Sequence, residues 1–115
     1  MKISQIYKIA DQLTQLSDNL SMACCTAREG VISKKFQKYS EYTIQNIRDI
    51  NELRFCVLNI IDWLEIEDND YGLEPQQLKK LEKEARKAWD LYEEIPKTYL
   101  PPAFVSLLNE LENRF

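Results

Sequence analysis

The sequence predicts an all-α protein, an antiparallel bundle of three long helices with a short C-terminal helix. Apolar residues recur at steps of three and four, which is the spacing of one helix face. No stretch alternates apolar and polar residues as a strand would. Two glycines and four prolines separate the periodic segments. A chain of 115 residues fits one domain, so we expect residues 1–115 to fold as a unit.

The first helix is predicted over about residues 3–29. Gly30 follows it, where a left-handed C-terminal cap is useful, and Val31 can fold back on the last turn. The apolar stripe of this helix consists of Ile6, Ile9, Leu13, Leu16, Leu20 and Ala23.

The second helix is predicted from about Ser33, a favourable N-cap, to Leu64. Aromatic and β-branched residues weaken it at "YSEYT" (39–43), so the sequence leaves open whether the helix is continuous there. Phe55, Leu58 and Ile61 widen its stripe, which predicts a central helix with two neighbours. The stripe itself consists of Ile47, Ile50, Leu53, Val57, Ile60 and Leu64.

The third helix is predicted to begin at Pro75, a favoured first helical position, and to end before Pro96. The connector "KTYLPP" then leads to a last helix over about 102–114. Both segments carry stripes at helical spacing, formed by Leu78, Leu81, Ala85, Ala88, Tyr92 and Ile95, and by Phe104, Leu107, Leu108, Leu111 and Phe115.

The net charge of −4 is unevenly distributed. Residues 1–64 hold eight basic and seven acidic side chains, whereas residues 65–115 hold seven and twelve. The stretch "LEIEDNDYGLEP" (64–75) has five acids and no base, and we expect it to connect two helices, with Gly72 turning the chain. Such a field favours a basic partner, although an ordinary solubilising surface has the same composition.

The residues that metal binding, phosphate binding and common catalytic mechanisms require are missing from the sequence. The acidic stretch fails as an EF-hand, because Tyr71 and Leu78 occupy ligand positions. There is no histidine and no glycine-rich phosphate loop, and three cysteines are too few for a zinc site. We therefore expect no enzymatic activity, no cofactor and no metal. The alternative is a magnesium-dependent nucleotide hydrolase, whose carboxylates would be Asp49, Glu52, Asp90 and Glu93.

The sequence also predicts where the protein works. Cys24, Cys25 and Cys56 do not form a disulfide framework and fit a reducing cytoplasm, where we expect them to fill the core. The first residues do not resemble a signal peptide, and no apolar run is long enough to cross a bilayer. Neither a nucleic acid nor a membrane is an expected partner.

From "MKISQIYKIADQL" to "LNELENRF" the chain resembles, in general character, the immunity proteins of contact-dependent growth inhibition and of nuclease bacteriocins. The resemblance implies an inhibitor that covers the basic active-site cleft of a toxin nuclease domain. The charge would come from Glu65, Glu67, Asp68, Asp70 and Glu74, and the aromatic anchors would be Trp63 and Tyr71. The alternative from another class is a homo-oligomeric scaffold or adaptor, paired through the stripes of the first and third helices.

Overall fold

The computed structural model describes residues 1–28, 34–70 and 72–114. The chain is all-α, which confirms the predicted fold class, and the described residues contain no strand. The order of elements is α1 (Ile3–Arg28), a 3₁₀ helix η1 (Lys34–Tyr39), α2 (Ile44–Asp70), α3 (Pro75–Glu94) and α4 (Ala103–Glu112).

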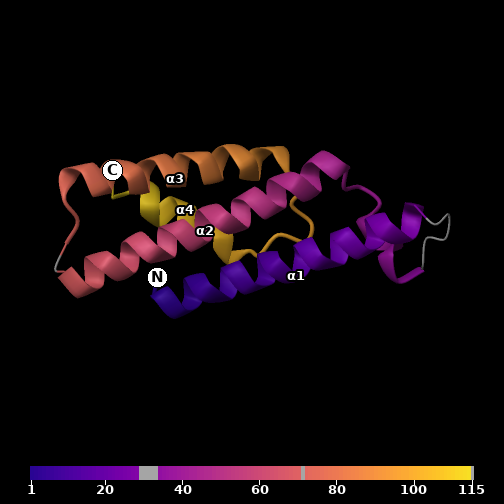
Figure 1. The fold of residues 1–115 in the computed structure, drawn as a ribbon, viewed down its shortest axis with the longest axis horizontal. Helices are drawn as coiled ribbons and strands as arrows, with labels where there is room; N and C mark the ends of the chain where they lie inside the picture. Colours follow the sequence, from indigo (N-terminus) through magenta and orange to yellow (C-terminus); the bar gives the residue numbers. More distant parts are fainter. Residues whose placement is uncertain (29–33, 71, 115) are drawn as a thin grey trace.

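The helices form an elongated bundle of 53 × 23 × 19 Å with α2 at its centre. α1 and α3 pack on opposite sides of α2, and α4 packs against α3 and the start of α1 (Figure 1). The start of α1, the end of α2 and the end of α4 all lie at one end of the molecule (Figure 1). This end is where the acidic stretch of the sequence lies.

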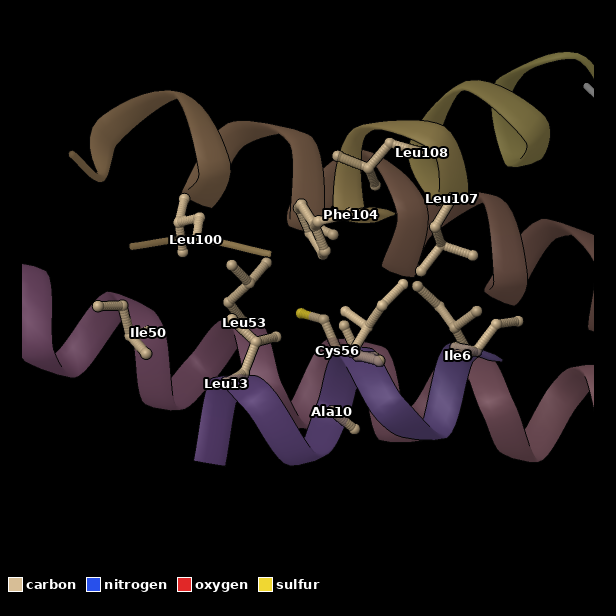
Figure 2. Close-up of a cluster of buried hydrophobic side chains, with 14 of the residues drawn as sticks. Ile6, Ala10, Leu13, Ile50, Leu53, Cys56, Leu100, Phe104, Leu107 and Leu108 are labelled. Atoms are coloured by element: carbon tan, nitrogen blue, oxygen red, sulfur yellow. The ribbon is translucent and has the colours of Figure 1, made fainter. Parts of the chain in front are cut away.

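The core is made by the predicted stripes and is covered by α4. Phe104 and Leu107 of α4 point from one side into the layer formed by α1 and α2, toward Leu53, Cys56 and Ile6 (Figure 2). Apolar burial of this kind is the main stabilising contribution to a small domain. The buried set includes Ile6, Ile9, Leu13, Leu16, Leu20, Ile50, Leu53, Val57, Ile60, Ile61, Leu64, Leu81, Ala85 and Ala88.

The predicted second helix is interrupted, and α2 begins at Ile44, eleven residues after Ser33. Thr43 starts it through a reciprocal cap, in which the Asn46 amide donates to Thr43 Oγ1 at 3.1 Å and the Thr43 amide donates to Asn46 Oδ1 at 3.0 Å. The prediction for Ser33, like that for Gly30 and Val31, lies outside the described residues.

A cluster of tyrosines explains the interruption at 39–43. The ring of Tyr39 lies 5.1 Å from that of Tyr99, and the Tyr42 ring lies 6.3 Å from it. The Tyr42 hydroxyl donates to the Pro96 carbonyl oxygen at 3.2 Å. These contacts join the segment before α2 to the connector after α3, and they stabilise a bend in place of a continuous helix.

The acidic stretch is mostly helical, so the prediction that it forms a connection is wrong for residues 64–70. α2 continues to Asp70, six residues beyond Leu64. The Gly72 amide then donates to the Glu67 carbonyl oxygen at 3.0 Å, and Gly72 has a φ of +140°, a value that favours glycine. Pro75 occupies the first turn of α3, as predicted.

Cys56 is buried in this core, with 1% of its surface exposed. Burial raises the pKa of its thiol from 9.0 to about 12, and the nearby Glu84 carboxylate adds to the effect. The folded state therefore keeps the thiol protonated, and the resulting stability is present below pH 9.0 and is lost as the pH rises toward 12. The side chains of Cys24 and Cys25 lie outside the described set.

Replacing Phe104 with alanine should lower the free energy of unfolding by about 3–5 kcal/mol, because the ring fills the space under α4. Urea unfolding followed by circular dichroism measures this. Ser106→Ala, at an exposed position of the same helix, should change it by less than about 0.5 kcal/mol. Equal effects of the two substitutions would mean that α4 does not close the core.

In a Cys24→Ser, Cys25→Ser background, Cys56 should react with a thiol reagent only when the protein unfolds. The reaction should be slow in buffer at neutral pH and rapid in denaturant, because the buried thiol is neither ionised nor accessible. Rapid labelling of the folded protein would contradict this placement.

Candidate protein-binding surface

Five of the predicted partner-binding residues, Trp63, Glu65, Glu67, Asp68 and Asp70, belong to the end of α2, which lies beside the start of α1 and the end of α4 (Figure 1). We call this region the acidic end and define it by Glu65, Glu67 and Asp68 of α2 and Glu110 of α4. Because a long helix holds three of these residues, their positions relative to one another are fixed to a degree that a flexible loop would not allow.

Glu65 joins α2 to α1. The Tyr7 hydroxyl donates a hydrogen bond to Glu65 Oε1 at 2.7 Å across 58 residues of sequence. This hydrogen bond, followed by burial and the negative charges of Glu65 and Asp62, raises the pKa of the Tyr7 hydroxyl above its ordinary value of 10.0. Glu65 therefore presents its charge with one oxygen already occupied.

Glu67 joins α2 to the residues that follow α4. It forms an ion pair with the Arg114 guanidinium, and both side chains are only partly exposed. Its backbone carbonyl oxygen also accepts the Gly72 amide that ends the helix. The negative charge of Glu67 is thus partly balanced within the chain.

Two other predicted residues have structural roles. Trp63 is half-buried and packs against the core, and Lys80 Nζ lies 5.8 Å from the centre of its ring. Glu74 immediately precedes α3, where its amide donates to Gln77 Oε1 at 2.9 Å. Trp63 therefore has part of its ring exposed, and the exposed carboxylate of Glu74 lies beyond the helix that carries the other acids.

Asp68 is exposed, and it has no hydrogen bond or ion pair within the described part of the chain. It is the acid of this group that presents its whole charge to solvent. The predictions for the Asp70 side chain and for Tyr71 fall outside the described residues.

A groove of about 370 Å³ opens beside Asp68 between α1, α2 and α4. Apolar side chains form much of it, and charged groups surround them, with Glu110 also accepting a bond from the N-terminal ammonium at 2.7 Å. A pocket with this lining can take one apolar side chain of a partner while the surrounding carboxylates contact basic groups. Its lining comprises Met1, Lys2, Ile3, Ile6, Leu64, Glu67, Asp68, Leu107, Glu110, Leu111 and Arg114.

The electrostatics of α2 strengthen the field at this end. A helix carries partial negative charge at its C-terminus, where basic side chains are favoured and acidic ones are not. The last turn of α2 has no basic residue, and Glu67, Asp68 and Asp70 stand there instead. The acids therefore cost stability locally and add to the dipole of the helix.

The alternatives from the sequence look different in the structure. Most of the stripe residues of α1 and α3 are buried within the chain, although Leu78 of α3 is exposed. The described part of the chain contains no group of three or more Cys, Asp or Glu side chains placed to hold a metal ion. Asp49 instead accepts a hydrogen bond from Gln45 at 3.0 Å. Within the same residues, no helix is long and apolar enough to span a membrane.

One surface was missed by sequence reasoning. Phe55 and Leu58, predicted to widen the core stripe, are 56% and 36% exposed, whereas Ile61 is buried as predicted. Ile44 is also 56% exposed, so the outer face of α2 carries exposed apolar side chains among its polar ones. The signal was the width of the apolar pattern, which exceeds what neighbours on two sides of a helix can cover.

Comparison of the chain with protein-family models, curated proteins and solved structures gives no match.

Asp68→Lys should raise the free energy of unfolding by about 1 kcal/mol, since it removes an acid from the negative end of α2 and supplies a base. Thermal or urea unfolding at low salt measures the change. Asp49→Lys, the same substitution in the second turn of the same helix, should not stabilise the protein, because it lies away from the C-terminal dipole and removes the hydrogen bond from Gln45. A loss of stability in Asp68→Lys would show that the acidic end is not under the electrostatic cost described here.

Proposed function

We propose that the protein is an inhibitor of the immunity-protein type, which neutralises a toxin nuclease by covering its basic active-site cleft with the acidic end. The observation that supports this most is the position of the exposed carboxylate of Asp68 at the negative end of the α2 dipole, beside the groove. A nuclease cleft must attract phosphates, so its charge is complementary to this surface.

Inhibition would follow from simple occlusion. Asp68 meets a basic group of the cleft directly, and the ion-paired Glu67 widens the negative surface around it. Because the helix already holds these side chains in place, little conformational freedom is lost on binding. Charge complementarity then gives rapid association, and an apolar side chain of the nuclease in the groove slows release.

The arrangement of α2 fits such a role better than a purely solubilising one. Solubility requires charge but no particular position, whereas these acids stand at the helix end where they cost the most stability. Binding surfaces commonly contain residues that lower the stability of the free protein. Here a partner of opposite charge would remove that local loss of stability. The protein would act without a cofactor or metal.

The test begins with capture of the partner from lysate of the source cells on the tagged protein, followed by its identification. We expect a basic nuclease domain whose cleavage of RNA or DNA stops at equimolar inhibitor. Asp68→Lys should weaken the complex about tenfold or more and reduce its dependence on salt. Asp90→Lys, an equal change of charge at an exposed position of α3, is the matched control and should bind normally.

Two results would contradict the proposal at different levels. A captured partner that has no nuclease activity, or whose activity persists in the complex, would overturn the inhibitor function. Inhibition that is equally strong with Asp68→Lys and wild type would retain the function but remove the acidic end as its site.

A further inference from the structure

We propose that the outer face of α2 pairs with the same face of a second copy of this chain, antiparallel, about a two-fold axis at Phe55. This inference is independent of the proposed function, because it uses a different surface and requires no other protein. Its basis is the order of side chains along the face, which is complementary to itself when reversed.

The face is the side of α2 turned away from α1, α3 and α4. Its centre is Phe55, and the exposed Ile44 and the half-buried Ile66 lie eleven residues before and after it, three helical turns away in each direction. Asn59 and Asp62, both exposed, lie on the same side. These three apolar side chains lie on one line along α2, with polar and charged side chains such as Arg48 and Asp62 between them.

The charges on this face match when the helix is reversed. Arg48 lies seven residues before Phe55, and Asp62 lies seven residues after it. In an antiparallel pair centred on Phe55, each Arg48 therefore stands opposite the Asp62 of the other copy, and this contact occurs twice. The two Phe55 rings meet at the axis.

The apolar side chains follow the same symmetry. Each Ile44 would lie opposite the Ile66 of the second copy, because these positions are also equidistant from Phe55. Asn51 is not part of this contact, since its Oδ1 accepts a hydrogen bond from the buried Ser17 of α1 at 2.7 Å. Apolar residues thus meet apolar residues, and bases meet acids.

The two charged groups form no close polar contact in the described part of the chain, although the charge of Asp62 acts on the Tyr7 hydroxyl. Neither Arg48 nor Asp62 forms a hydrogen bond or ion pair there, although Glu65, next along the helix, does. The central ring is also accompanied by a cation, since Arg54 Cζ lies 5.0 Å from its centre. A second copy would supply what the single chain leaves unpaired on this face.

The pairing is compatible with partner binding. Antiparallel α2 helices place the two acidic ends at opposite ends of the dimer, about ten residues of helix beyond the axis on each side. Each end stays open to a separate partner. One helix face per copy gives a small interface, so we expect a dimer with a Kd on the order of micromolar.

The decisive experiment mixes two variants of the purified protein. Arg48→Asp places acids opposite acids at both symmetric contacts, and Asp62→Arg places bases opposite bases, so each variant alone should dimerise about tenfold or more weakly. In the mixture, the acids of one variant face the bases of the other at both contacts. Sedimentation equilibrium should then show heterodimers with an affinity close to that of the wild type.

The matched control uses Lys83→Asp and Asp90→Arg, which change the charge equally at exposed positions of α3. These variants should dimerise as the wild type does, separately and mixed. Circular dichroism checks that every variant keeps its helices. The proposal is overturned if the wild type stays monomeric well above micromolar concentrations, if the single variants dimerise as well as the wild type, or if mixing them forms no heterodimer.

Discussion

α2 packs against α1 on one side and α3 on the other, and the rest of the molecule depends on this burial. α4 can close the core only because three long helices offer it an apolar floor, into which Phe104 points (Figure 2). The same packing determines which parts of α2 stay exposed. These are its outer face and part of its C-terminal end, which α1, α3 and α4 do not cover. One helix thus organises the core and both proposed binding surfaces.

The fold class and most core residues follow from local periodicity, because residues such as Leu13 and Leu81 are buried in any bundle that covers their stripe. The end of α2 does not follow from local sequence. Acids at a helix C-terminus favour ending the helix earlier, and the contacts that oppose this, Tyr7 with Glu65 and Arg114 with Glu67, span 58 and 47 residues. Pairs that distant leave no signal in a single sequence.

The same contrast between local sequence and long-range contacts applies to the candidate site. The location of the negative charge could be predicted from the sequence, since residues 65–74 contain five acids and no base. The sequence could not predict which of these acids is available to a partner. The roles of Glu65, Glu67 and Trp63 depend on the residues that tertiary packing brings beside them. The exposure of Phe55 could not be predicted for the same reason. An apolar residue on a wide stripe is expected to be buried, and only the number of helices packed around α2 shows that it is not.

The central proposal is that the acidic end of α2 contacts a basic partner. Amide hydrogen exchange of the protein, free and in complex with its captured partner, tests this most directly. We expect new protection in the last two turns of α2 and at the end of α4, around the groove that Asp68 lines. Protection confined to the outer side of α3, with unchanged exchange at the acidic end, would contradict it.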